Sequence, residues 1–310
     1  MDSFQRKQLI TQRSLKYTYY VSTSGESTDQ TPALLFLHGF PDSAHLWTGV
    51  IDELGNLPNK IIVPDCLGYA GTDKPTDTNL YAYKDQAEDI ADILINENAK
   101  NTIIIGHDWG SAIAQRTYLH KRHLFSGVVL KVIGYPQFSY WDFFISPDAA
   151  DIVENNLERM WQALHGDEED WMRKIFCASN AMRDFLLGTE QVPLKDYAKQ
   201  STYKDQFMQQ FQPGEFASSL QAYKAAAWNI QHKSDAAISR DELDIKVPLL
   251  FICCTKDAVC TPGLMEPAKQ QGLVPYLKEV TMEAGHWSPM EKPDEIARHI
   301  KDFLGDMPAH

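Results

Sequence analysis

The stretch Thr102–Ser111, TIIIGHDWGS, holds the feature that decides the fold. Its first half is a short apolar run, which is typical of a β-strand buried on both faces of a sheet. Its second half, Gly106–Gly110, has a glycine two positions to either side of Asp108, and a helical stretch, Ser111–His120, follows. This strand–turn–helix spacing predicts a nucleophile elbow, which presents its central side chain at the carboxyl edge of a parallel sheet. Here that side chain is Asp108.

Further apolar runs surround the elbow, and helical stretches alternate with them. The runs are Ala33–Leu37, Lys60–Pro64, Gly127–Ile133 and Val247–Cys253. Ser14–Ser22, rich in Tyr, Thr and Val, is expected to be an early strand, and Tyr276–Met282 to be a late one. Helices are expected at Tyr81–Asn98 and Pro293–Leu304. Strands and helices in alternation predict an α/β protein with a mostly parallel sheet and helices on both faces.

The alternation stops between residues 135 and 240. This interval contains amphipathic stretches such as Ile152–His165 and a polar region around Gln200–Gly214, but no strand-like apolar run. We therefore expect one α/β core, made of residues 1–134 and 241–310, with a helical insertion at 135–240 before the last strands. This insertion is called the cap below.

The composition describes an ordinary globular chain and narrows its partners. The 310 residues are 44% hydrophobic, and the net charge of −13 argues against nucleic acid or an anionic membrane as the main partner. No window of roughly 18 apolar residues is present, so no membrane span is expected. The polar N-terminus has no signal-peptide pattern, and the five cysteines include no C-x-x-C pair. We expect a cytoplasmic protein with reduced thiols, and predict no particular oligomeric state.

An aspartate at the centre of the elbow predicts substitution at saturated carbon. A serine that attacked such a carbon would leave an ether, which water does not readily cleave. A carboxylate leaves an ester, which activated water can hydrolyse at its carbonyl carbon. The chain contains no G-x-S-x-G motif, which counts against a serine esterase. Asp108 is therefore the expected nucleophile.

An acid and a histidine follow the nucleophile in the order typical of α/β-hydrolases. Asp257 comes just after the run Val247–Cys253, and His286 follows the expected strand Tyr276–Met282. Asp257 is expected to orient the imidazole and to stabilise its cation, and His286 to activate water. Together with Asp108 they form the predicted triad.

Two backbone N–H groups are candidates for the oxyanion hole. His38-Gly39-Phe40-Pro41 follows the strand-like run Ala33–Leu37, and Trp109 follows the nucleophile. The N–H groups of Phe40 and Trp109 could stabilise the oxyanion of the ester intermediate. Pro41 fixes the turn, with a cis Phe40–Pro41 bond as one option.

Four motifs in order resemble those of soluble epoxide hydrolases, in the aspartate-nucleophile branch of the α/β-hydrolase superfamily. They are HGFPDSAHLW (His38–Trp47), GHDWGS (Gly106–Ser111), TKDAV (Thr255–Val259) and GHWSPMEKPDEI (Gly285–Ile296). The resemblance spans almost the whole predicted core. It implies an α/β-hydrolase fold, and conversion of a small apolar epoxide to a vicinal diol with water as co-substrate. It implies no metal and no organic cofactor.

The resemblance also implies two cap tyrosines that hold the epoxide oxygen and protonate the opening alkoxide. LQAYK followed by Trp228-Asn229 resembles the second tyrosine segment and gives Tyr223. YWDFF resembles the first and gives Tyr140, with Tyr135 and Tyr197 as alternatives. The chemical need is clear, because an unassisted alkoxide is a poor leaving group and a phenol with a pKa of about 10 is a competent donor.

The expected pocket is largely apolar and lies over the triad. Besides Trp109 and Phe40, the expected lining residues are Trp141, Phe144, Trp287 and Met290. The cap sequence from Asp167 to Gln212 matches no motif, and we expect it to shape the pocket. The turn Cys66–Gly71 departs from the usual glycine-rich form, which affects the expected loop shape but no catalytic role.

Two other functions use the same residues or the same fold. Haloalkane dehalogenases share the Asp/His/Asp triad and Trp109, but they need a second N–H donor for halide where this chain has Phe40. A fluoroacetate dehalogenase would have Arg in place of Trp109. A non-catalytic ligand-binding protein on this fold is the third alternative, and the intact triad counts against it.

Overall fold

The computed structural model describes residues 4–131, 139–259 and 263–307 and contains an eight-stranded sheet of order β1-β2-β4-β3-β5-β6-β7-β8. The strands are β1 Phe4–Ile10, β2 Lys16–Ser22, β3 Ala33–Leu37, β4 Ile61–Pro64, β5 Thr102–His107, β6 Phe125–Lys131, β7 Leu249–Cys254 and β8 Leu277–Met282. β2 pairs antiparallel with β1 and with β4, and every other pair is parallel. The predicted mostly parallel sheet is confirmed.

Strand β1 was missed by the sequence analysis, which treated the first thirteen residues only as a polar N-terminus. Its sequence, FQRKQLI, has no buried position in the structure. β1 is an edge strand that pairs antiparallel with β2, and such a strand can be stabilised by backbone hydrogen bonds without an apolar face. By contrast, every residue of β3, β4, β5 and β7 is buried, which explains why those strands were visible as apolar runs.

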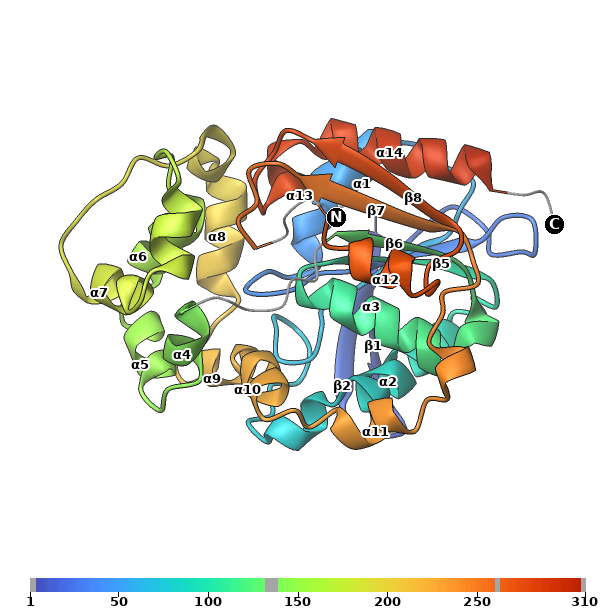
Figure 1. Ribbon diagram of the computed structural model, residues 1–310, viewed down its shortest axis with the longest axis horizontal. Coiled ribbons are helices and arrows are strands. Elements are labelled where there is room, and N and C mark those ends of the chain that lie inside the picture. The colour runs from blue at the N-terminus through green and yellow to red at the C-terminus, as the bar shows by residue number, and fades with distance from the viewer. Residues whose placement is uncertain (1–3, 132–138, 260–262, 308–310) are drawn as a thin grey trace.

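Helices cover both faces of the sheet (Figure 1). α1 (Thr48–Leu54) and α14 (Pro293–Asp306) pack together on one face, and α2 (Tyr83–Asn96) and α3 (Trp109–His120) on the other. α14 buries Ile296, Ala297, Ile300 and Phe303 along one stripe, the pattern of a helix that packs on a sheet. The short helix α12 (Glu266–Gln270) lies between β7 and β8.

The described part of the cap contains helices and no strand, and most of it lies at one end of the sheet (Figure 1). Its α-helices are α4 Tyr140–Phe144, α5 Ala149–Glu154, α6 Leu157–His165, α7 Ala181–Leu187, α8 Ser201–Gln209, α9 Phe216–Ser219, α10 Gln221–Ala227 and α11 His232–Ala236. A π-helix (Arg173–Cys177) and the 3-10 helix η5 (Asp196–Lys199) complete the set. The exact division at residues 134/135 and 240/241 stays a prediction.

The structure shows which helices the two cap stretches named above contain. The stretch Ile152–His165 is not one helix, because the chain breaks at Asn155-Asn156 between α5 and α6. Asn156 leaves the helical conformation, with φ −137° and ψ 35°, and its carbonyl accepts the first hydrogen bond of α6 from Met160. The polar region around residues 200–214 contains α8.

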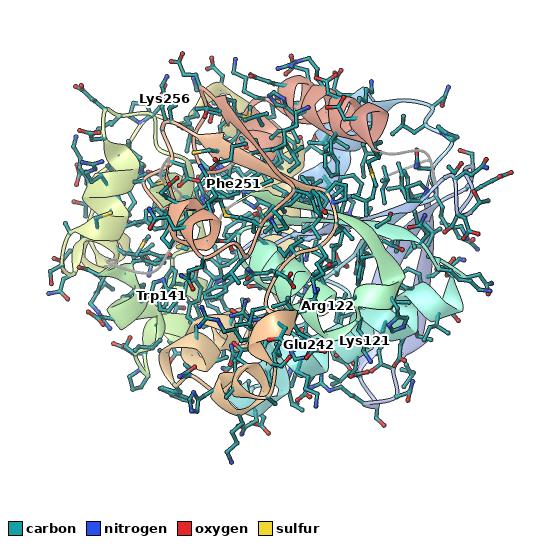
Figure 2. The ribbon with its side chains drawn as sticks, turned by 45° about the vertical axis from the view of Figure 1, so that its right-hand side comes forward. Lys121, Arg122, Trp141, Glu242, Phe251 and Lys256 are labelled. Atoms are coloured by element: carbon teal, nitrogen blue, oxygen red, sulfur yellow. The ribbon has the colours of Figure 1, made fainter. Side chains whose placement is uncertain are left out.

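Figure 2 relates the two parts of the molecule at the level of side chains. Phe251 of β7 is enclosed in the core, whereas Trp141 of α4 lies in the cap. Glu242 follows the cap in the chain, and its carbonyl accepts a hydrogen bond from the Arg122 guanidinium of the core (Figure 2). No helix in the described residues is long and apolar enough to cross a membrane.

Candidate active site

The elbow brings Asp108 to the carboxyl end of β5, directly before α3. Asp108 has φ 53° and ψ −130°, a left-handed backbone conformation that is costly for a residue with a side chain. A Cβ on Gly106 would lie 2.5 Å from the Gly110 carbonyl oxygen, and one on Gly110 would lie 2.3 Å from the Leu37 carbonyl oxygen. Both glycines are therefore required, because the backbone passes too closely for any side chain.

The structure brings the three predicted triad residues together. His286 Nδ1 lies 2.9 Å from Asp257 Oδ2, and His286 Nε2 lies 3.5 Å from Asp108 Oδ2. A carboxylate can only accept, so the Asp257 contact assigns the proton to Nδ1 and turns the Nε2 lone pair toward Asp108. The Val259 N–H donates to Asp257 Oδ1 at 2.8 Å, and His107 Nε2 lies 2.9 Å from the His286 carbonyl oxygen. The acid and the backbone of the histidine are thus both held in place.

The predicted oxyanion donors lie beside the same carboxylate. The Phe40 N–H donates to Asp108 Oδ1 at 2.7 Å. A Cβ on Gly39 would lie 2.3 Å from that oxygen and 2.6 Å from the Trp109 nitrogen, so the Gly39 backbone passes close to both. The Phe40–Pro41 peptide bond is cis. Oδ1 therefore has a hydrogen-bond donor in the resting site, while Oδ2 faces the histidine.

Tyr140 of α4 and Tyr223 of α10 reach the same cavity as Asp108. Both line the cavity together with Asp108 and His286, and their ring centroids are 5.9 Å apart. Burial raises the pKa of the Tyr140 phenol, and the Asp108 charge raises it further. Burial, then the neighbouring Tyr140 and Asp108, raise the pKa of Tyr223 well above its usual value. Both phenols are therefore protonated in the resting site.

The alternatives for the first tyrosine have other positions. Tyr135 lies outside the described residues. Tyr197 is buried in η5, where its hydroxyl lies 3.2 Å from His165 Nδ1, and it does not line the cavity. Among the described candidates, Tyr140 is the one that lines the cavity together with Asp108 and Tyr223.

The cavity around Asp108 is lined mainly by apolar side chains from the cap and from the core. Its remaining lining residues are Phe40, Leu164, Met172, Phe176, Val259 and Trp287. Of the expected pocket residues, Phe40 and Trp287 line it directly, whereas Trp109 lines a neighbouring cavity. Phe144 packs behind Phe40 and Tyr223, Trp141 packs against Trp109 and Tyr223, and Met290 is buried in α13 (Ser288–Glu291).

Four of the lining residues, Leu164, Met172, Phe176 and Val259, were not predicted from the sequence. Met172 and Phe176 come from the segment 167–212, which was expected to shape the pocket, although no single residue in it could be singled out. Leu164 ends the apolar side of α6, and Val259 follows Asp257 by two residues. No chemical motif marks these side chains, because their role is to supply apolar surface.

The sheet order, the elbow after β5 and the Asp–His–Asp set at one edge of the sheet define the α/β-hydrolase class of folds. The comparison with protein families agrees. A family model described as alpha/beta hydrolase fold matches residues 32–293. The chain belongs to this family.

Several relatives in this family are epoxide hydrolases. Epoxide hydrolase A of Mycobacterium tuberculosis is 26% identical over 297 residues, which cover 88% of this chain and 90% of that protein. Bifunctional epoxide hydrolase 2 of Rattus norvegicus is 25% identical over 291 residues, 88% of this chain and 51% of that protein, so this chain spans about half its length. The crystal structure of Epoxide Hydrolase A from Mycobacterium thermoresistibile superposes with a TM-score of 0.79 at 20% identity and covers 99% of this chain and 100% of that chain, a likeness that shows the fold.

Proposed function

We propose that this chain hydrolyses a small apolar epoxide to a vicinal diol through an ester on Asp108. The observation that carries the proposal is the pair of buried phenols, Tyr140 and Tyr223, which line an apolar cavity together with Asp108. A serine esterase has no need of two acids across the cavity from the nucleophile. Opening of an epoxide does need such acids, because the leaving alkoxide must be protonated. The names of the relatives agree with this reading.

In the first step Asp108 Oδ2 attacks a ring carbon. A new carbon–oxygen bond forms to Oδ2 as the carbon–oxygen bond of the strained ring breaks, and the released oxygen takes a proton from Tyr140 or Tyr223. Oδ1 is already held by the Phe40 N–H at 2.7 Å, so it becomes the carbonyl oxygen of the ester. The products of this step are a hydroxyalkyl ester and one phenolate.

The tyrosines become better acids as the attack proceeds. In the resting site the Asp108 charge is among the causes that raise the pKa of both phenols. Conversion of Asp108 into a neutral ester removes this contribution at the moment when charge develops on the epoxide oxygen. The phenols therefore stay protonated before the reaction, and their acidity increases when a proton is needed.

In the second step His286 activates water. Nε2, whose lone pair faces Asp108, takes a proton from water, and the oxygen attacks the ester carbonyl carbon. The Phe40 and Trp109 N–H groups stabilise the oxyanion, and Asp257 stabilises the imidazolium at 2.9 Å. Collapse breaks the bond to the alkyl oxygen, which leaves as the diol with the proton from His286. The phenolate regains the remaining proton, and no metal or organic cofactor takes part.

Haloalkane dehalogenation is the second candidate, and one observation favours it. The indole nitrogens of Trp109 and Trp141 are buried near the Tyr223 and Tyr140 hydroxyls, respectively, and the two rings are 5.4 Å apart. A halide could accept from both. However, neither indole lines the cavity that contains Asp108, and Phe40 offers no side-chain donor.

One experiment separates the candidates. The purified protein is incubated with a styrene-oxide-type epoxide and, separately, with a bromoalkane of similar size, while diol and bromide are followed. Diol without bromide, lost in Asp108→Ala, is the expected result. Bromide without diol would replace the proposal with dehalogenation, and tight binding of an epoxide without turnover would favour the non-catalytic alternative.

The setting of the reaction is also a proposal. The thiols of Cys66 and Cys177 are free, while Cys260 lies outside the described residues. Free thiols fit a reducing compartment such as the cytoplasm.

A further inference from the structure

An ion pair joins the cap to the core beside the candidate base. Lys195 directly precedes η5 in the cap, and Glu291 ends α13, the short helix that begins two residues after His286. Lys195 Nζ lies 3.5 Å from Glu291 Oε2. The same oxygen accepts the Gly285 N–H at 3.0 Å. One carboxylate oxygen therefore contacts both a cap lysine and the backbone of the residue before His286.

The lysine lies directly over this piece of backbone. A Cβ on Gly285 would be 2.8 Å from Lys195 Nζ and 3.2 Å from Glu291 Oε2, so the ends of both charged side chains lie close to this backbone. The two charged side chains are 29% and 21% exposed. This partial shielding from solvent distinguishes the pair from a fully exposed ion pair, which contributes little.

A second contact connects the same cap segment to the same turn. The Lys195 N–H donates to the His165 carbonyl at 3.0 Å, and the Tyr197 hydroxyl lies 3.2 Å from His165 Nδ1. The His165 ring packs against Trp287 at 4.6 Å, and Trp287 packs against His286 at 4.8 Å. The cap therefore touches the turn on both sides of His286, through Glu291 on Gly285 and through His165 on Trp287.

We propose that Lys195 and Glu291 are positioning residues that hold the turn Gly285–Trp287, and with it His286 Nε2, in line for ester hydrolysis. This inference rests on the proposed function, because hydrolysis of the Asp108 ester is the step it affects. Without Lys195 the Glu291 carboxylate is free to rotate into solvent and to release the Gly285 N–H. A shift of the base by a fraction of an ångström slows proton transfer, while the first step, in which His286 transfers no proton, is unaffected.

The test compares Lys195→Met, Glu291→Gln and Lys195→Arg by rapid quench with the epoxide. The first two are expected to slow decay of the Asp108 ester by about 3- to 10-fold, and arginine, which keeps the charge, to restore most of the rate. Where ester hydrolysis limits turnover, kcat and KM fall together and kcat/KM is unchanged, because formation of the ester precedes the affected step. Partial unfolding would instead lower kcat at constant KM.

The matched control is Lys204→Met, which removes another cap lysine that pairs with a glutamate. Lys204 of α8 contacts Glu158 of α6, so both partners belong to the cap and neither touches the turn around His286. Its ester decay is expected to equal that of the wild type. An equal loss in Lys204→Met, or an increase in KM with unchanged ester decay in Lys195→Met, would overturn the inference. Absence of any ester or diol in the wild type would instead refute the proposed function itself, and the inference with it.

Discussion

Replacement of His286 by glutamine should stop the reaction after its first step. The imidazole is held by Asp257 at 2.9 Å with Nε2 3.5 Å from Asp108 Oδ2, and no other described residue that lines the cavity has a neutral nitrogen base. The variant therefore loses the full general-base contribution to ester hydrolysis, about 10²- to 10⁴-fold. That loss corresponds to about 3 to 5 kcal/mol on the barrier of the second step. Attack by the Asp108 carboxylate requires no proton transfer to His286, so alkylation should keep its rate.

The assay is rapid mixing with a styrene-oxide-type epoxide, acid quench and mass measurement of the intact protein. His286→Gln should gain the mass of one epoxide molecule and keep it, and peptide mapping should locate the addition on Asp108. His123→Gln, a change at an exposed histidine in the 3-10 helix Arg122–Leu124, is the control and should show normal turnover. The reasoning is refuted if alkylation slows by the same factor as diol release, because His286 would then act in the first step.

Four further predictions follow from the same geometry. Tyr140→Phe and Tyr223→Phe should each slow alkylation, and the double variant should lose about 10²- to 10⁴-fold in the pre-steady-state rate of ester formation. A double variant no slower than one of the single variants would mean that a single phenol donates the proton. Because the pKa of both phenols is raised, alkylation in pH-jump experiments should stay flat through pH of about 10, where an unperturbed tyrosine ionises, and a decline centred there would contradict the burial argument. In a single turnover in ¹⁸O-labelled water, the label should enter the Asp108 carboxylate and not the diol. Label in the diol formed in that turnover would exclude the ester intermediate. Finally, burial raises the pKa of Asp65 to about 6, so the protonated side chain contributes about 3 kcal/mol of stability below about pH 4, and this contribution is lost as the pH increases to 6. Urea titrations at pH of about 4 and about 6 should show that Asp65→Asn lacks this part of the pH dependence of stability. A variant with the same pH dependence as the wild type would refute the prediction.

The arrangement of the triad was predictable because of a property of parallel sheets. Asp108 and Asp257 each follow an apolar run, His286 follows the more exposed strand β8, and carboxyl ends of parallel strands share one edge. Apolar runs of β5 and β7 are visible in sequence since both faces of those strands are buried. Because the strands end at one edge of the sheet, the triad side chains lie next to one another although they are far apart in sequence.

The cap was predictable only where chemistry marks a residue. Tyr140 and Tyr223 stand in recognisable segments, whereas Met172 and Phe176 differ in no local way from other apolar residues of the cap. Which apolar side chain reaches the cavity depends on how short helices pack, and small changes in crossing angle alter that choice. Strand β1 was missed for a related reason, because an exposed edge strand needs no apolar pattern.

The proposed reaction keeps a single negative charge in the cavity from beginning to end. The charge starts on Asp108, where the Phe40 N–H stabilises it at 2.7 Å. It passes to the epoxide oxygen and then to one tyrosine as the ester forms, and it stays on that phenolate while the His286 imidazolium balances the oxyanion beside Phe40 and Trp109. In an apolar cavity a second uncompensated charge would be costly, and the raised pKa of both phenols expresses that cost in the resting site. An aspartate nucleophile and tyrosine acids therefore belong together: the phenols can release a proton cheaply only after the carboxylate has become an ester.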